Sequence, residues 1–169
     1  MPFAILIGPP GAGKSTVGRA LAKRLAVDFH DTDHLVEEHA KKKISEIFVE
    51  DGESVFRAME EVQVAYALEH CTGVISLGGG AIMSVETQEL LAPLKEKVIL
   101  LEVSISQAAP RVGFNKDRPM LMVNPRQQWQ ALLEKRLPIY RSLSSFSIST
   151  DSMKPVEVAE KIAAYLEKK

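Results

Sequence analysis

The pattern G-x-x-x-x-G-K-S, at residues 8–15, is the part of this sequence whose residue types specify chemistry most directly. Its glycines allow a loop to wrap around phosphate groups and to aim backbone N–H groups at them. Lys14 adds a positive charge for the β- and γ-phosphates, and Ser15 has the type and position to give its hydroxyl to Mg²⁺. We therefore expect a nucleoside triphosphate to be bound by Gly11, Ala12, Gly13, Lys14, Ser15 and Thr16.

The residues around this pattern supply the strand and the helix that it requires. The apolar run 3–7 precedes it, and Val17, Leu21 and Leu25 follow at intervals of four among basic residues, which is typical of an amphipathic helix. The positive end of that helix dipole would point at the same phosphates. This context favours a phosphate-binding loop over a glycine-rich turn without a ligand.

Two aspartates, Asp31 and Asp33, follow the predicted second strand two residues apart, so in extended backbone they point the same way. Phosphoryl transfer depends chiefly on positioning and charge stabilisation, and it needs one carboxylate near Mg²⁺ and one near the acceptor hydroxyl. The alternative is that Thr32 or Asp33 caps the following helix, a role that can coexist with catalysis. We expect at least one of the two aspartates to act in catalysis or metal binding.

Three consecutive glycines, 78–80, follow a buried apolar run and allow a ligand to approach the backbone closely, although a merely permissive turn is the alternative. Arg57 and Arg136 lie in predicted helices that should flank the same edge of the sheet. Each guanidinium could form a two-pronged contact with a carboxylate. Surface ion pairs are the alternative for either arginine, since Glu60 and Glu61 stand at helical spacing from Arg57.

Short apolar runs alternate with helical patterns along the chain, which indicates repeated strand–helix units and a parallel sheet. Ligands bind such sheets beyond the carboxyl ends of the strands. The stretch that begins at Gly113 is polar, with Gly and Pro, and we expect a mobile lid at about 113–123. The predicted strands are 3–7, 27–30, 73–77, 97–102 and 146–150, and the predicted helices lie near 14–26, 32–42, 53–70, 84–92, 104–112, 125–143 and 155–167.

The bulk properties limit the possible functions. The 169 residues fit one domain, 1–169, and the formal net charge of -1 with mixed signs gives no basic surface for nucleic acid. Cys71 is the only cysteine, so an intrachain disulfide or a cysteine-based zinc site cannot form. The chain has no signal-type start and no apolar stretch long enough for a membrane span. We expect a cytoplasmic monomer with neither membrane nor nucleic acid as a partner.

Six short segments together resemble the shikimate kinase family across nearly the whole chain: G-P-P-G-A-G-K-S-T, D-T-D, F-R with Glu60 and Glu61 close behind, S-L-G-G-G-A, R-P-M and K-R-L-P-I-Y. The resemblance implies a three-layer α/β fold of the P-loop nucleoside-monophosphate-kinase type, with a five-stranded parallel sheet flanked by helices, a mobile lid, and substrate-binding helices at about 32–70. It also implies transfer of the γ-phosphoryl group of ATP to the 3-hydroxyl of shikimate, with Mg²⁺, in the biosynthesis of chorismate and aromatic amino acids.

The same resemblance implies a role for individual residues. Asp33 would hold the reacting hydroxyl, and Asp31 would reach Mg²⁺ through water. Arg57, oriented by Glu60, and Arg136 would hold the shikimate carboxylate. Further residues would line the two substrates: Gly79 and Gly80 beside shikimate, Ile44, Phe48 and Phe56 as an apolar wall under its ring, Arg118 as the lid arginine that meets the phosphates, and Arg111 stacked on the adenine.

The sequence also departs from the pattern of that family. Met120 stands where the family usually has Leu, and Pro110, just before Arg111, could end its helix early. The segment 150–155 matches the adenine loop only loosely, with Lys154 as its one basic residue. Rival interpretations are a gluconate-type kinase, a nucleoside monophosphate kinase, or a nucleotide-dependent switch without an acceptor pocket. The first has no need of two arginines that face a carboxylate, and the second needs further arginines for another phosphate.

Overall fold

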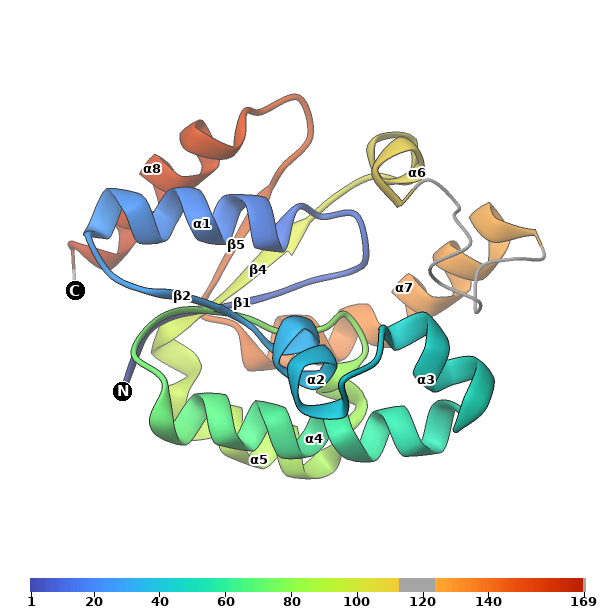
Figure 1. The fold of residues 1–169 in the computed structure, drawn as a ribbon. Helices are drawn as coiled ribbons and strands as arrows, with labels where there is room; N and C mark the ends of the chain where they lie inside the picture. The colour runs from blue at the N-terminus through green and yellow to red at the C-terminus, as the bar shows by residue number, and fades with distance from the viewer. Residues whose placement is uncertain (113–123, 169) are drawn as a thin grey trace.

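The computed structural model describes residues 1–112 and 124–168. Five strands form one sheet in the order β2-β3-β1-β4-β5, and every neighbouring pair is parallel (Figure 1). This arrangement confirms the predicted parallel sheet. The strands are β1 (Pro2–Ile7), β2 (Phe29–Asp31), β3 (Gly73–Ser76), β4 (Val98–Glu102) and β5 (Phe146–Ser149).

The central strand β1 is buried on both faces, as a parallel sheet covered by helices requires. Ala4 and Leu6 belong to the apolar cluster on one face, whereas Ile5 and Ile7 belong to the cluster on the other. All four side chains are at most 1% exposed. The alternation follows from the period of two in an extended strand.

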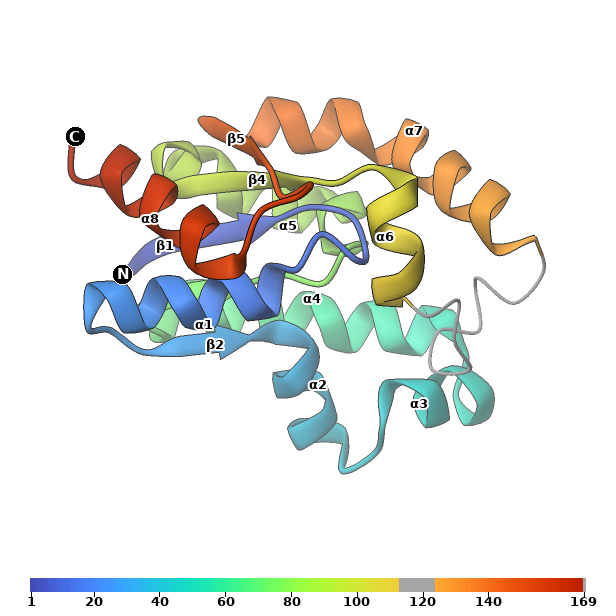
Figure 2. The ribbon, with the colours of Figure 1, turned by 90° about the horizontal axis from the view of Figure 1, so that it is seen from above.

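Helices cover both faces of the sheet and make the third layer (Figures 1 and 2). Helices α1 and α8 lie on one face, and α4, α5 and most of α7 lie on the other. The helices are α1 (Lys14–Leu25), α2 (Thr32–Ala40), α3 (Ile44–Glu50), α4 (Glu53–His70), α5 (Val85–Leu91), α6 (Ile105–Val112), α7 (Pro125–Leu143) and α8 (Pro155–Leu166), with short 3-10 helices η1 (Ala81–Met83) and η2 (Ala92–Lys97). No helix in the described parts of the chain is both long and apolar enough to cross a membrane.

Helix α3 was not expected from the sequence, which left residues 43–52 without an element. Two contacts at its start explain it: the N–H of Lys43 donates to the carboxylate of Glu46 at 3.0 Å, and the N–H of Ile44 donates to Glu37 at 3.1 Å. The fully buried Ile47 then anchors the short helix against Val36 and its neighbours. A helix of two turns with one anchor gives too weak a periodic signal to be detected.

Pro110 does not end its helix early, and the predicted helix at 104–112 is confirmed. Helix α6 contains Pro110 and continues to Val112. The proline cannot make the hydrogen bond that an N–H at this position would donate, and its ring crowds the preceding turn. The rest of the turn is held from its start, where Ala108 donates to the carbonyl of Ser104 at 2.9 Å. The predicted lid at 113–123 lies outside the described residues.

Candidate active site

The loop between β1 and α1 forms a cradle of backbone groups. Gly11 and Gly13 both have φ of 83°, a left-handed conformation that glycine adopts without strain, so these positions explain the glycines of the pattern. The Lys14 ammonium donates to the carbonyl oxygens of Gly8 at 2.7 Å and of Pro9 at 3.1 Å, which keeps this charge over the loop. Beside the loop lies a cavity of about 260 Å³, lined by Gly11, Gly13, Lys14, Ser15, Thr16, Asp31, Asp33, Ser76, Leu77, Gly78, Gly79 and Arg111.

Asp31 links this loop to the second strand. One oxygen of its carboxylate accepts a hydrogen bond from the hydroxyl of Ser15, and the other accepts from the N–H of Asp33 at 3.0 Å. Asp31 is therefore the N-cap of α2, and the alternative in which Thr32 or Asp33 caps this helix is wrong. Thr32 is buried instead, where its hydroxyl accepts from the N–H of Gly78 at 3.1 Å.

The glycines 78–80 are packed against the functional side chains. A Cβ atom at Gly78 would lie 2.5 Å from an oxygen of Glu60 and 2.6 Å from an oxygen of Asp33. A Cβ atom at Gly80 would clash with the guanidinium of Arg57. These approaches, rather than a need for unusual backbone angles, explain two of the three glycines. The loop therefore brings Asp33, Glu60 and Arg57 to one place.

Arg57 is held by two carboxylates of its own helix. Its Nη1 atom lies 2.7 Å from Glu60, and its Nε atom lies 3.5 Å from Glu53. Glu61 bonds to the Ser84 hydroxyl at 2.8 Å. The Glu60 side chain is buried, and this burial raises its pKa above the ordinary value, although the charge of Arg57 opposes the shift. Of the two partners that the sequence suggested, Glu60 pairs with Arg57, and the second carboxylate at this arginine belongs to Glu53. Arg57 also borders a cavity.

That second cavity has a volume of about 570 Å³ and lies between α4, η1 and α7. Arg136 borders it and is only 5% exposed, so a surface ion pair does not account for this arginine. One turn later, the hydroxyl of Tyr140 donates to the carbonyl of Gly79 at 2.5 Å, and burial raises the pKa of this phenol to about 12. The lining residues are Glu53, Arg57, Ala58, Glu60, Glu61, Gly80, Ala81, Met83, Ser84, Leu132, Lys135 and Arg136.

The three apolar residues expected under the substrate ring do lie together. The rings of Phe48 and Phe56 are 4.8 Å apart between centroids, and Ile44 packs into the same cluster. The Arg57 guanidinium lies 5.2 Å from the centroid of Phe56. Phe56 is also core, so its burial alone does not establish contact with a ligand.

Arg111 reaches the nucleotide loop from α6. Its Nη1 atom donates to the carbonyl of Gly11 at 3.2 Å and to the hydroxyl of Thr150 at 3.3 Å. Ala12 is buried in the loop, and its N–H donates to the carbonyl of Pro9 at 3.2 Å. Arg118 lies outside the described residues, so its expected place at the phosphates stays a prediction.

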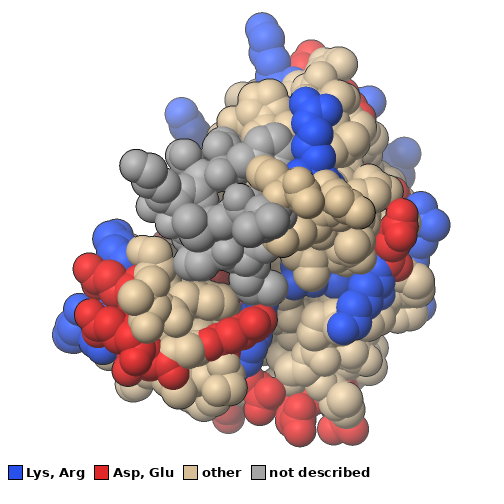
Figure 3. All heavy atoms as spheres, turned by 90° about the vertical axis from the view of Figure 1, so that its right-hand side faces the viewer, with Lys and Arg blue, Asp and Glu red and all other residues tan. Residues whose placement is uncertain are grey.

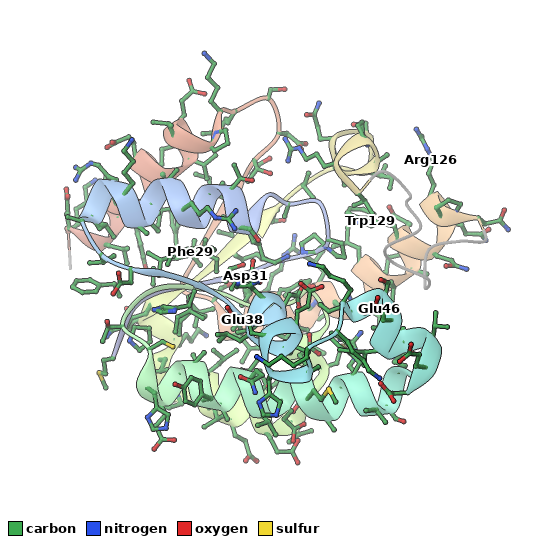
Figure 4. All side chains as sticks on the ribbon, viewed as in Figure 1. Phe29, Asp31, Glu38, Glu46, Arg126 and Trp129 are labelled. Carbon is green, nitrogen blue, oxygen red and sulfur yellow. The ribbon has the colours of Figure 1, made fainter. Side chains whose placement is uncertain are left out.

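Sequence reasoning missed one contact to this loop. The indole N–H of Trp129 donates to the carbonyl of Pro10 at 2.9 Å, and Figure 4 shows Trp129 between α7 and the loop after β1. A usable signal exists in the sequence, because Trp129, Arg136 and Tyr140 are spaced seven and four residues apart and so share one face of a helix. Figure 3 shows that acidic and basic side chains are interspersed around this side of the molecule.

Comparison with known proteins agrees with this geometry. The family model described as shikimate kinase matches residues 10–167. The chain belongs to the shikimate kinase family. A curated shikimate kinase from Thermobifida fusca is 53% identical over 98% of this chain and 95% of its own length.

Solved structures give the same result for the fold. The shikimate kinase from Acinetobacter baumannii in complex with shikimate superposes with a TM-score of 0.91 at 35% identity, covering 98% of this chain and 92% of that one. A gluconokinase from Sinorhizobium meliloti has a TM-score of 0.59 at 19% identity, covering 98% of this chain and 91% of that one. The second likeness concerns the fold alone, whereas the first lies within the shikimate kinase family.

Proposed function

We propose that this protein transfers the γ-phosphoryl group of ATP to the 3-hydroxyl of shikimate. The observation that carries the proposal is the packing of Asp33, Glu60 and Arg57 against one glycine loop that adjoins the phosphate-binding loop. A carboxylate beside the phosphates and a guanidinium a short distance further suit an acceptor that has both a hydroxyl and a carboxylate.

On the nucleotide side, the loop N–H groups and Lys14 hold the phosphates. Arg111 lines the same cavity and bonds to Gly11, which supports its assignment to the adenine base. The donor set fits Mg²⁺, because the Ser15 hydroxyl and the Asp31 carboxylate are oxygen donors already in contact with each other. Ser15 would ligate the ion directly and Asp31 through water. When bound, Mg²⁺ neutralises charge on the β- and γ-phosphates. Arg118 is assigned to the transferred group on the family pattern alone.

On the acceptor side, Asp33 takes the hydrogen bond of the reacting hydroxyl and can accept its proton as the phosphoryl group moves. Arg57 and Arg136 bind the carboxylate, since a guanidinium offers two parallel N–H donors to it. Glu60 keeps Arg57 oriented through the 2.7 Å contact. Gly79 and Gly80 leave room for the ring of the substrate beside the backbone.

A coupled assay of ADP release with shikimate, quinate, gluconate and AMP tests the proposal. We expect turnover with shikimate to exceed that with each other compound by at least about tenfold, the factor that about 1.4 kcal/mol in the transition state produces. Turnover that is fastest with gluconate or AMP would assign the protein to a rival class of kinase. Hydrolysis of ATP that no acceptor stimulates would indicate a nucleotide-dependent switch.

Two lysine variants separate this chemistry from contaminating activity. Lys14→Ala removes the charge at the transferring phosphoryl group, and we expect turnover to fall by at least about a hundredfold. Lys23→Ala, in the last turn of the same helix, is the matched control and should keep wild-type activity. Activity of folded Lys14→Ala close to the wild type would contradict the assignment of the loop. A monomeric, single-domain enzyme in the cytoplasm, with no nucleic-acid partner, stays a prediction.

A further inference from the structure

Three buried side chains on one face of α7 connect the two loops of the site. Trp129, Arg136 and Tyr140 are 1%, 5% and 0% exposed. Their spacing of seven and then four residues places them in one stripe along the helix. Arg136 borders the cavity between α4, η1 and α7. Trp129 and Tyr140 bond to backbone carbonyls of the nucleotide loop and of the glycine loop, respectively.

The contacts close into a ring. Trp129 donates to the carbonyl of Pro10 in the nucleotide loop, and Tyr140 donates to the carbonyl of Gly79 in the glycine loop. These two loops also touch each other, since a Cβ atom at Gly79 would lie only 3.0 Å from Cδ of Pro10. Starting from α7, the ring therefore runs through Trp129, Pro10, Gly79 and Tyr140 back to α7.

The bond from Trp129 controls the orientation of a peptide that matters for phosphate binding. In a trans peptide the carbonyl and the following N–H point in opposite directions. Holding the carbonyl of Pro10 toward α7 therefore aims the N–H of Gly11 away from that helix. Gly11 lies in the left-handed region with φ of 83°, where glycine has wide conformational freedom. The bond from Trp129 to the carbonyl of Pro10 therefore restricts a peptide that glycine alone would leave free to rotate.

We propose that Trp129 is a positioning residue that couples occupancy of the nucleotide loop to the placement of Arg136. A phosphate that orders the loop also orders Pro10, and through the indole bond it restrains α7. The second ligand then pays less of the ordering cost, which gives positive coupling without a change of shape. Thermodynamic linkage requires the acid to strengthen nucleotide binding by the same factor. This inference rests on the proposed function, because it takes shikimate as the ligand of Arg136.

Calorimetric titration of shikimate in the absence and presence of saturating ADP measures the coupling. We expect ADP to strengthen shikimate binding in the wild type by about fivefold or more, within the range usual for coupled sites. In Trp129→Phe, which keeps an aromatic ring and loses the N–H donor, we expect this ratio to fall by at least half. The dissociation constant of shikimate without ADP should change by less than about twofold, because Arg136 is intact. A merely structural role would weaken binding in both conditions and leave the ratio unchanged.

A second variant and a control test whether the coupling depends on the two bonds between α7 and the loops. Tyr140→Phe removes only the hydroxyl that completes the ring at Gly79, and the coupling ratio should fall here too. Tyr165→Phe removes a hydroxyl that bonds to Ser145 away from both loops and should leave the ratio unchanged. Trp129 is also the only tryptophan, so ADP should change the emission of the wild-type protein directly.

The outcomes separate the two proposals. A wild type that couples the two ligands, together with Trp129→Phe and Tyr140→Phe variants that keep the full ratio, would overturn the role of Trp129 and leave the proposed function intact. Independent binding of ADP and shikimate by the wild type would likewise overturn the coupling alone. A wild type that binds ADP but no shikimate would overturn the proposed function and the coupling that depends on it.

Discussion

Asp31 has a different partner at each oxygen of its carboxylate, the hydroxyl of Ser15 and the backbone of Asp33. The same side chain therefore caps a helix and orients the nucleotide loop. Capping also fixes the start of α2, which carries Asp33 toward the glycine loop. The capping contact uses one carboxylate oxygen and leaves the other beside Ser15, so capping is compatible with the metal-binding role proposed for Asp31.

Asp33→Asn should reduce kcat far more than it reduces ATP binding. The amide keeps the shape of the side chain but cannot accept the proton of the reacting hydroxyl, so we expect kcat to fall by about a hundredfold or more. The dissociation constant of ATP, measured by titration on the same preparation, should change by less than about threefold. If turnover and ATP binding fell together, Asp33 would instead be a structural residue or a metal ligand.

Arg136→Lys should raise the KM for shikimate by about tenfold and leave the KM for ATP nearly unchanged. An ammonium cannot reproduce the two parallel hydrogen bonds of a guanidinium to a carboxylate. Steady-state kinetics with each substrate varied in turn measures both constants. Arg126→Lys is the matched control, because this exposed arginine of the same helix points away from the site (Figure 4). A raised KM for ATP alone would move Arg136 into the nucleotide site.

At the scale of elements, the site depends on how closely α4 approaches the glycine loop. The loop ends in η1, and Gly80 has ordinary backbone angles, with φ of -95°. Glycine is required there because the guanidinium of Arg57, from α4, occupies the space that a Cβ atom would take. The packing of a helix against a loop, and no property of the loop itself, makes this position sensitive to substitution.

Gly80→Ala should therefore displace Arg57 and raise the KM for shikimate, with an effect of about tenfold, comparable to the loss of one charged contact. Backbone strain does not contribute, so the melting temperature should fall little. ADP affinity should stay within about twofold of the wild type, because the nucleotide loop is untouched. Kinetics and thermal unfolding on the same variant measure these effects. An unchanged KM for shikimate would contradict the placement of Arg57 at the acid.

At the scale of the molecule, three elements bring three charged side chains around the buried carboxylate of Glu60. The Glu60 side chain from α4 faces the charges of Arg57, of Asp33 and of Arg136 from α7. Burial is the largest influence and raises the pKa of Glu60, Arg57 and Arg136 act to lower it, and Asp33 raises it further. Because the carboxylate of Glu60 is buried, its contribution to the free energy of unfolding depends on pH.

Glu60 should make stability fall as the pH rises. Its folded-state pKa lies above the ordinary value of 4.5, so the folded protein binds this proton more tightly than the unfolded chain does. The favourable contribution is complete below about 4.5 and is lost as the pH rises through the folded-state pKa. The free energy of unfolding of the wild type, relative to Glu60→Gln, should decrease across this window in urea unfolding at successive pH values. Glu61→Gln is the control, and a difference from Glu60→Gln that is independent of pH would contradict the prediction.

The sequence alone determined the parallel sheet, the phosphate-binding loop and the set of polar residues at the carboxyl edge, because these depend on local periodicity and on motifs of fixed spacing. The tertiary structure decided which residue caps α2. Asp31 accepts from the N–H of Asp33, and its other carboxylate oxygen contacts Ser15 in another element. It also decided that Glu60 is buried and that Trp129 bonds to Pro10 across 119 residues of sequence. Such contacts depend on how helices pack against loops, and no local pattern in the chain predicts a contact between residues so far apart in sequence.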